Sequence, residues 1–285
     1  MGVMTPKPRS AEYFDGWYAD KSDAPQVGEI MNRNLGLPPD ALAGIVPAVA
    51  LDEIAGELRL KPGDVLLDLA CGRGWYGLEI TARAGARLIG VDFSAEAVRQ
   101  AGQQARLRNR DDAEFQTGDL AASGLPDGSV NAVLCTDSIQ FPERPEAAYR
   151  ELRRVLVPGG RVVLTSWEPV DPGDESLTER MRRVDLGAGL RDAGFIDIEV
   201  KDRPQWLACE QAVWQEAVAL DPGADPALRS FHDEGVRSLQ WATALRRVMA
   251  AATAPSGSRE STAQRSRTGR YELRLVWIMQ VLKTS

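Results

Sequence analysis

A glycine-rich turn after a short apolar segment is the part of the sequence whose residue types first indicate ligand chemistry. Residues 68–74 read Asp-Leu-Ala-Cys-Gly-Arg-Gly and follow the apolar residues 65–67. Gly72 and Gly74 permit positive φ angles and let the backbone approach a ligand closely. The N–H groups that begin the next helix favour a negative group, and the Asp68 carboxylate adds an acceptor. The turn therefore suits a ligand end that needs donors and an acceptor together.

Two further carboxylates follow apolar segments downstream. Asp92 comes directly after residues 88–91 and suits a ribose, because one carboxylate can accept from two vicinal hydroxyls. Asp119 follows Gly118, just beyond the short strand candidate 114–116, and Phe93 and Leu120 beside these acids would sandwich a flat base. The alternatives are structural: Asp92 as a charge at a helix N-terminus, Asp119 as a turn residue, and the two apolar side chains as core.

The same turn also matches the dinucleotide-binding pattern G-x-G-x-x-G. Residues 72–77 read Gly-Arg-Gly-Trp-Tyr-Gly, and Asp92 lies twenty residues beyond Gly72. Two features argue against a dinucleotide. Asp68 places a carboxylate where a pyrophosphate would be repelled, and the bulky residues 75–76 suit close pyrophosphate packing poorly. A nicotinamide-dependent oxidoreductase is therefore kept only as an alternative.

The elements that must position these residues alternate between strands and helices from residue 64 onward. Helices are expected over 75–84, after the capping residue Ser94, and from Pro145, where apolar residues recur at helical spacing. Repeated strand–helix units predict an α/β fold with a doubly wound, mostly parallel sheet. The buried strands expected are 65–69, 88–91 and 130–135, which are largely apolar. A further strand is expected over 161–167, and 114–116 is a short strand candidate.

The two ends of the chain depart from this alternation. We predict an N-terminal helical lid over 1–60, a core over 61–203 plus 270–285, and a helical cap insertion over 204–269. The cap should cover the carboxyl-terminal edge of the sheet, where ligands bind in open α/β folds. The elements expected here are helices over 48–58, 207–220 and 227–252, and strands over 195–201 and 271–282, with the C-terminal strand antiparallel.

Taken together, residues 64–167 resemble the class I S-adenosylmethionine-dependent methyltransferase family. The four blocks that carry the resemblance, at consistent spacing, are 67–74, 90–94, 118–120 and 152–160. The resemblance implies a Rossmann-like fold and S-adenosyl-L-methionine as methyl donor, with S-adenosyl-L-homocysteine as product and no metal. More specifically, the sequence is similar to bacterial enzymes that tailor natural products.

The resemblance also implies which residues contact the cofactor. Asp92 would hold the ribose hydroxyls, Asp119 would reach the adenine amino group, and a lid segment would fold over the cofactor and exclude water. The lid's aromatic residues Tyr13, Trp17 and Tyr18 could instead simply anchor that segment. The implied cofactor contacts are Tyr18, Asp68, Ala70, Gly72, Gly74, Asp92, Phe93, Asp119, Leu120 and Asp137.

Methyl transfer from a sulfonium is an in-line displacement that proximity and alignment can largely drive. A base is needed only where the accepting atom keeps its proton, and His232 is the one histidine available. Many relatives carry histidine just after the fourth strand, where this chain has Gln140, which cannot take a proton but can orient a substrate. We therefore predict His232 and Gln140 as catalytic residues, and Trp17 and Trp167 as substrate contacts. The acceptor atom is left open among oxygen, nitrogen and carbon.

Composition narrows the class of partner. The formal charge of −7 argues against nucleic acid, and no long apolar run indicates a membrane segment. The three cysteines and the single histidine show no metal-ligand spacing, and free thiols fit a cytoplasmic location. We predict a small-molecule acceptor as partner and a monomer or homodimer. A non-catalytic, cofactor-binding member of the same fold is the second alternative.

Overall fold

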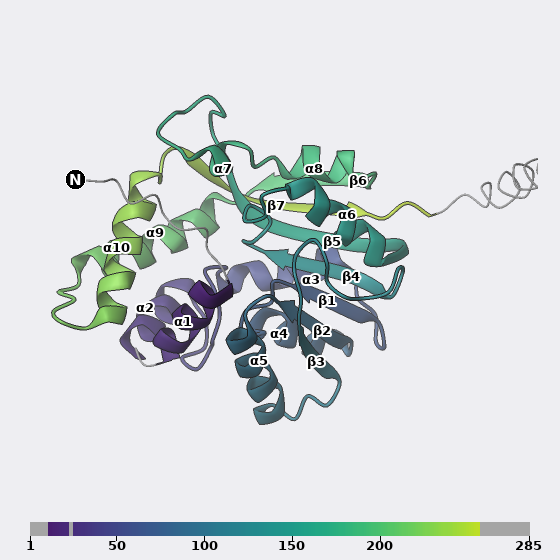
Figure 1. Cartoon of the computed structure of the whole chain (residues 1–285), viewed down its shortest axis with the longest axis horizontal. Coiled ribbons are helices and arrows are strands. Elements are labelled where there is room, and N and C mark those ends of the chain that lie inside the picture. The colour runs from purple at the N-terminus through teal and green to yellow at the C-terminus, as the bar shows by residue number, and fades with distance from the viewer. Residues whose placement is uncertain (1–10, 23–24, 257–285) are drawn as a thin grey trace, which may run out of the picture. The chain divides into compact units, whose positions relative to one another are not determined.

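A computed structural model describes residues 11–22 and 25–256, and its described part up to Ala254 is organised around one sheet (Figure 1). The strand order is β3-β2-β1-β4-β5-β7-β6. Neighbouring strands from β3 to β5 pair in parallel, and β7 pairs antiparallel with both β5 and β6. The strands are β1 (Val65–Leu69), β2 (Arg87–Asp92), β3 (Ala113–Thr117), β4 (Val130–Thr136), β5 (Leu156–Pro169), β6 (Ile196–Asp202) and β7 (Leu245–Thr253). The predicted mostly parallel α/β sheet with an antiparallel C-terminal strand is confirmed.

Helices cover both faces of this sheet because the central strands are apolar on both sides. Leu66 packs in one core cluster with α3 (Leu51–Leu58) and α4 (Trp75–Ala84). Its neighbour Leu67 points the other way, into a second cluster with α6 (Pro145–Val155) and α8 (Leu186–Asp192). Alternate side chains of a strand face opposite sides, so a strand buried on both faces reads as a continuous apolar run.

The remaining helices include α5 (Ala95–Leu107) and two groups that lie at one end of the sheet. Ser94 begins α5 and accepts a hydrogen bond from Ala97 N–H, which confirms the predicted cap. At one end of the sheet, α1 (Ala11–Ser22) and α2 (Pro25–Leu35) lie close to α9 (Pro204–Ala219) and α10 (Pro226–Gln240) (Figure 1). The short elements are η1 (Ala48–Ala50) and α7 (Glu179–Arg182).

The helix expected over 227–252 is wrong in its second half. It ends at Gln240, and residues 245–253 form β7, between β5 and β6. The run Val-Met-Ala-Ala-Ala at 248–252 favours a helix by propensity, but every one of these residues is buried in the sheet. Tertiary pairing therefore overrides local propensity here. The strand predicted over 271–282, with the core segment 270–285, lies outside the described residues, and the division into lid, core and cap stays a prediction.

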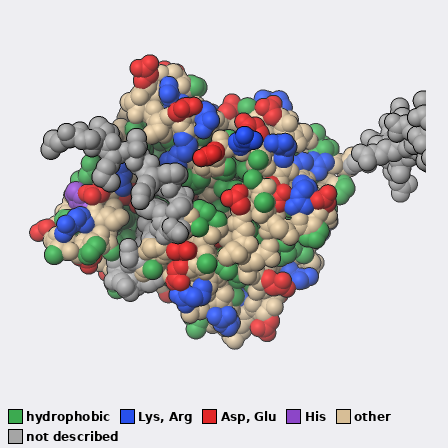
Figure 2. Space-filling model, viewed as in Figure 1, with side chains coloured by type: hydrophobic (Ala, Val, Ile, Leu, Met, Phe, Trp, Pro, Cys, Tyr) green, Lys and Arg blue, Asp and Glu red, His purple; other side chains and the backbone are tan. Residues whose placement is uncertain are grey.

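Charged side chains of both signs are interspersed on the face of the molecule drawn in Figure 2. No continuous basic stripe crosses the visible part of that face. Within residues 11–22 and 25–256, none of the helices combines the length and the apolar composition needed to cross a membrane.

Candidate functional site

The turn between β1 and α4 is held in an unusual backbone conformation. Ala70, Gly72 and Gly74 have φ angles of 64°, 54° and 77°. The N–H groups of Ala70 and Cys71 both donate to the Val91 carbonyl, at 2.7 and 3.0 Å, and so attach the turn to β2. Left-handed backbone is readily adopted only by glycine, so this hydrogen bonding must hold Ala70 in place.

Close packing explains all three glycines of the G-x-G-x-x-G pattern. A Cβ atom on Gly72 would lie 2.8 Å from the Tyr18 hydroxyl oxygen of α1. On Gly74 it would lie 2.7 Å from the Phe115 ring, and on Gly77 it would lie 2.8 Å from Asp68 Oδ2. These distances exclude side chains at the three positions. They also place Tyr18, a predicted cofactor contact, directly over the turn.

Asp68 is a buried carboxylate without a hydrogen-bonding partner. Its exposed fraction is 1%, and within the described residues neither oxygen has a hydrogen bond of normal geometry. Burial raises the pKa of Asp68 to about 7, while the Gly77 N–H opposes that rise and Asp92 adds to it. Buried polar groups are nearly always satisfied, so an orphaned carboxylate beside a glycine turn indicates a missing ligand group.

Asp92, the last residue of β2, lies against the same turn. Its Oδ2 accepts from Gly72 N–H at 2.8 Å, and its Oδ1 accepts from Ser94 N–H at 3.0 Å. Burial raises the pKa of Asp92, and these backbone N–H groups oppose the rise. The side chain therefore ties the turn to the start of α5 and leaves lone pairs for a further donor such as a hydroxyl.

The aromatic residues near Asp92 gather around the lid helix α1. The Phe14 ring lies 5.2 Å from the Phe93 ring and 6.0 Å from the Phe141 ring, measured between centroids. Phe93 itself is 37% exposed, so part of its ring is accessible beside Asp92. Contact of Phe93 with a flat base stays a prediction.

Asp119 forms a turn, as its structural alternative proposed. Its carboxylate accepts from Ala121 N–H at 2.8 Å, and its backbone pairs with that of Ala122. The side chain is exposed at the end of β3, while Leu120 packs against the second core cluster. Contact of either residue with an adenine stays a prediction.

Polar contacts fix α1 onto the start of α5. Asp15 Oδ1 accepts from Ser94 Oγ at 2.5 Å and from Glu96 N–H at 3.1 Å, and the Tyr18 carbonyl accepts from Gln100 Nε2 at 3.2 Å. Asp15 thus caps the N-terminus of α5 from outside that helix. The sequence reasoning missed this role. The side chains of Tyr13 and Trp17 lie outside what the structure describes.

A second charged cluster lies at the ends of β4, β5 and β7. Asp137 was predicted to contact the cofactor, but both of its oxygens bind the buried Arg247 of β7, at 2.8 and 2.6 Å. Thr165 Oγ1 also donates to Asp137, at 2.6 Å. Burial alone would lower the pKa of Arg247, but the carboxylates of Asp137 and Glu210 raise it. The cation is therefore held charged inside the protein.

Glu210 of α9 completes this cluster. It accepts from Trp167 Nε1 at 2.9 Å and from Trp214 Nε1 at 3.2 Å, and Oε2 lies 3.6 Å from Arg247 Nε. The Arg247 guanidinium also lies 4.0 Å from the centroid of the Trp167 ring, a cation–π contact. The sequence reasoning missed both charged residues. In the sequence, Arg247 and Glu210 could have been noticed only as charged residues within otherwise apolar segments.

Gln140 contacts Ser166, the residue that precedes Trp167. Gln140 Nε2 donates to the Asp137 carbonyl at 2.7 Å, and Gln140 Oε1 accepts from Ser166 Oγ at 3.2 Å. His232 lies on α10 with a side chain that is 28% exposed, and its Nδ1 is 3.3 Å from Asp233 Oδ1. Within the described residues, no hydrogen bond or ion pair joins His232 to the other two.

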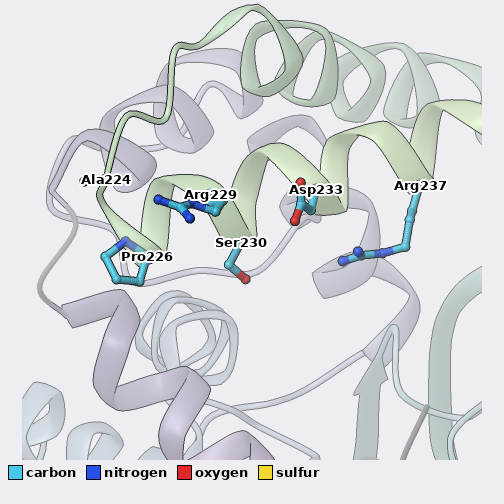
Figure 3. Close-up of a pocket in the computed structure, with 6 residues that line it drawn as sticks. All are labelled: Ala224, Pro226, Arg229, Ser230, Asp233 and Arg237. Carbon is cyan, nitrogen blue, oxygen red and sulfur yellow. The ribbon is translucent and has the colours of Figure 1, made fainter. Parts of the chain in front are cut away.

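A hollow of about 380 Å³ runs along α10 close to His232 (Figure 3). Figure 3 shows Arg229, Ser230, Asp233 and Arg237 along the helix, and Arg229 donates to the Gly223 carbonyl at 2.9 Å. The lining contains neither His232 nor any residue from a strand end. The residues that line it are Ala224, Pro226, Arg229, Ser230, Asp233 and Arg237. This hollow is therefore separate from the site around Asp68.

Known proteins with similar sequences and structures are methyltransferases for the most part. Residues 67–164 match the family model of the methyltransferase domain. The chain is 30% identical over 174 residues to 27-O-demethylrifamycin SV methyltransferase of Amycolatopsis mediterranei, covering 54% of this chain and 64% of that protein. Across the curated relatives that it matches, the chain spans between 32% and 64% of their lengths.

Two solved structures share the fold. The [4+2]-cyclase SpnF superposes with a TM-score of 0.69 at 21% identity, over 87% of this chain and 97% of that chain. Phosphoethanolamine N-methyltransferase 2 of Haemonchus contortus, solved with phosphomonomethylethanolamine and S-adenosylhomocysteine, gives 0.65 at 19% identity, over 84% and 59%. The family model and the curated relative confirm the resemblance noted in the sequence.

Proposed function

We propose that the chain, whose residues 67–164 match the family model of the methyltransferase domain, transfers a methyl group from S-adenosyl-L-methionine to a small-molecule acceptor. The observation that carries this proposal is Asp68. A buried carboxylate without a partner, next to a turn with left-handed glycines, needs a ligand that brings a positive group. The amino-acid end of the methyl donor is such a ligand.

The other residues of the turn fit the same cofactor. Asp92 has lone pairs free for ribose hydroxyls, and Phe93 offers an exposed ring for the base. Tyr18 lies over Gly72 and covers the turn from the lid side. We propose these residues, with Asp68, Ala70, Gly74, Asp119 and Leu120, as the cofactor-binding set. Asp137 was also predicted to contact the cofactor, but Arg247 and Thr165 already bind its carboxylate. We therefore propose that Asp137 supports the site without contacting the cofactor through this group.

The bound cofactor would supply a sulfonium-activated methyl group, so the protein's task is alignment and exclusion of water. Helix α1 covers the glycine turn through Asp15 and Tyr18. Gln140 is held at both ends of its amide group and presents a fixed polar surface near Trp167. We propose that this region orients the acceptor, with Trp17 contributing from the lid.

A general base is the least supported part of the mechanism. His232 stays the predicted base, and its contact with Asp233 would orient the ring. The turnover rate of His232→Gln with an identified acceptor tests whether His232 is the general base. Loss of about 10²–10⁴-fold would support a base, and a change below about threefold would remove His232 from the mechanism. In the second case Gln140 would remain as an orienting group.

The class of acceptor rests on the relatives. A rifamycin methyltransferase is the curated relative described above, so we propose a small natural product as acceptor, methylated on oxygen, nitrogen or carbon. We further propose a cytoplasmic, metal-independent enzyme that acts as a monomer or homodimer without nucleic-acid or membrane partners. Size-exclusion chromatography with light scattering tests the oligomeric state.

The proposal is tested first by ligand binding. Fluorescence titration of the native tryptophans should show saturable binding of S-adenosylhomocysteine and none of NADH. Asp68→Asn serves as the matched variant, and it should bind S-adenosylhomocysteine much more weakly. Saturable binding of NADH alone would instead establish the oxidoreductase alternative.

A member of the fold that binds the cofactor without methylating is the second candidate. The observation that favours it is Gln140, which cannot take a proton and whose amide nitrogen and oxygen each already make a hydrogen bond within the protein. Turnover assays separate the two candidates. Tight binding of S-adenosylhomocysteine together with no methylated product from a broad acceptor library would favour the non-methylating reading.

A further inference from the structure

Arg73 lies between the two glycines of the turn and has no anionic partner in the described part of the chain. Its side chain is half-buried, and it makes no hydrogen bond or ion pair with a described residue. Arg108 and Arg110, by contrast, are paired: Arg108 contacts Glu79 at 2.6 Å, and Arg110 contacts Asp112 at 2.7 Å. The charge of Arg73 is therefore not balanced by a carboxylate of the described residues.

The groups around Arg73 cannot balance its charge. Burial lowers the pKa of Arg73, and the only groups that oppose this are the phenols of Tyr18 and Tyr76. Burial in turn raises the pKa of both phenols, so at neutral pH they are uncharged. Tyr76 is also engaged with the backbone of Val46, at 3.0 Å as donor and as acceptor. A partly desolvated guanidinium without a counter-anion is unfavourable until an anion arrives.

Asp68, like Arg73, is a charged residue without a partner of opposite charge, but it carries a negative charge. It is the orphaned carboxylate of the same turn, and neither Asp68 nor Arg73 is among the groups that shift the pKa of the other. The two charges therefore do not compensate each other. One unpartnered anion and one unpartnered cation on a single glycine turn match a zwitterionic amino-acid group, which brings one charge for each.

We propose that Arg73 binds the carboxylate of the amino-acid end of the methyl donor, while Asp68 receives its ammonium group. This inference rests on the proposed function and assigns a role that the glycine pattern alone does not contain, because the pattern leaves the residue between the glycines open. Arginine suits the role because its fork can donate two hydrogen bonds to one carboxylate.

The test compares two ligands across matched variants of the full chain. The ligands are S-adenosylhomocysteine and its decarboxylated form, which keeps the amine and lacks the carboxylate. Calorimetry should show that the wild type prefers the carboxylated ligand by about 10- to 100-fold, the range for a charged hydrogen bond. Arg73→Gln should lose this preference to within threefold and bind the decarboxylated ligand as the wild type does. Arg73→Lys should lie between them.

Arg83→Gln is the control, because Arg83 is an exposed arginine of α4 that pairs with Asp52 at 2.8 Å. It should bind both ligands as the wild type does. A second readout guards against misfolding: ligand-free Arg73→Gln should unfold at the same temperature as the wild type or higher, since it loses an unbalanced cation. Its stabilisation by S-adenosylhomocysteine should be smaller.

Three outcomes would overturn the inference. A preference for the carboxylated ligand that survives Arg73→Gln places the carboxylate elsewhere. An equal loss of affinity for both ligands indicates a structural role. Unchanged binding of both ligands together with a raised KM for an acceptor assigns Arg73 to an anionic group of that acceptor. If the wild type binds neither ligand, the proposed function itself fails, which is a distinguishable result.

Discussion

Two pairs of acidic residues lie near the carboxyl-terminal edge of the sheet, and they differ in how their charge is balanced. Asp68 and Asp92, on β1 and β2, have no cationic side chain in hydrogen-bonding contact among the described residues, and Asp68 has no hydrogen bond of normal geometry there. Asp137 and Glu210 enclose the buried Arg247 and receive further hydrogen bonds from Thr165, Trp167 and Trp214. We call Asp68 and Asp92 the open pair, because no cationic side chain of the described residues balances them. We call Asp137 and Glu210 the closed pair, because Arg247 balances their charge.

This difference separates binding from support. The closed pair joins the end of β4 to β7 and α9 through one cation. The open pair adjoins the glycine turn and the lid helix, where an incoming group can still be received. Buried charge without a partner costs stability, whereas a fully hydrogen-bonded network gives rigidity. The predictions below test this comparison.

Removing the cation of the closed pair should have the largest effect. Arg247→Met leaves Asp137 and Glu210 buried without a counter-charge, and we expect a loss of about 3–5 kcal/mol in the free energy of unfolding. Chemical denaturation measures it. Arg83→Ala is the control, because Arg83 pairs with the exposed Asp52 and its loss should cost at most about 1 kcal/mol. Equal losses in the two variants would show that the closed pair is not a structural unit.

Neutralising Asp68 of the open pair should raise the stability of the ligand-free protein. Asp68→Asn removes a buried, unpartnered charge, so the ligand-free protein should become more stable at pH 8, by about 1–2 kcal/mol. For a chain of this size the midpoint should rise by about 2–8 °C. Affinity for S-adenosylhomocysteine should nevertheless fall by about 10- to 100-fold, as calorimetry can measure. A destabilised variant with unchanged affinity would refute the ligand role of Asp68.

The raised pKa of Asp68 predicts a pH dependence of binding. With a pKa of about 7 in the ligand-free protein, the carboxylate needed for the ammonium group is lost as pH falls. Affinity for S-adenosylhomocysteine should weaken about tenfold from pH 8 to pH 6. Asp68→Asn should show a flat profile over this range. A flat profile in the wild type would contradict the assignment.

The same pKa shift has the opposite consequence for stability. Because the folded pKa lies above the ordinary value of 3.8, the folded state retains a proton that the unfolded chain releases. The contribution of Asp68 to stability is therefore fully favourable below about pH 4 and is lost as pH rises to about 7. The advantage of ligand-free Asp68→Asn over the wild type should grow across that window and stay constant above it.

Loosening the lid should have the smallest effect. Asp15→Ala removes the acceptor for Ser94 Oγ and Glu96 N–H at the start of α5, and a lost cap is worth about 0.5–2 kcal/mol. We expect faster hydrogen exchange in α1 and a dissociation rate of S-adenosylhomocysteine raised by about two- to tenfold. Asp52→Ala, at an exposed pair with Arg83, is the control. Unchanged dissociation would show that α1 does not retain the ligand.

Much of the core could be predicted from local pattern. The run 65–69 is apolar enough to be a strand buried on both faces, and Pro145 and Ser94 mark helix starts that the structure confirms. The glycine turn could be recognised because its residues are contiguous and each has a local conformational reason. The site residues carried by these elements, Asp68 and Asp92, therefore lie near each other as expected.

The misplaced strand shows where local pattern stops. Residues 248–252 carry helical propensity, and only their position between β5 and β6 makes them a strand. With that strand comes Arg247, whose ion pair with Asp137 joins residues 110 positions apart in the chain. No spacing rule links two such positions. Sequence reasoning therefore identified the acidic residues but could not say which of them already had a partner.

The sequence by itself determined the alternation of strands and helices, the glycine turn and the acidic residues that follow successive strands, because these depend on neighbours a few residues apart. Only the tertiary structure decided which charges are balanced. In the folded chain Arg247 binds Asp137, and Tyr18 lies over Gly72. Asp68 and Arg73 have no partner of opposite charge among the described residues. The physical reason is that a charge is balanced by whatever lies within a few ångströms, and the folded chain, not the order of residues, sets that distance.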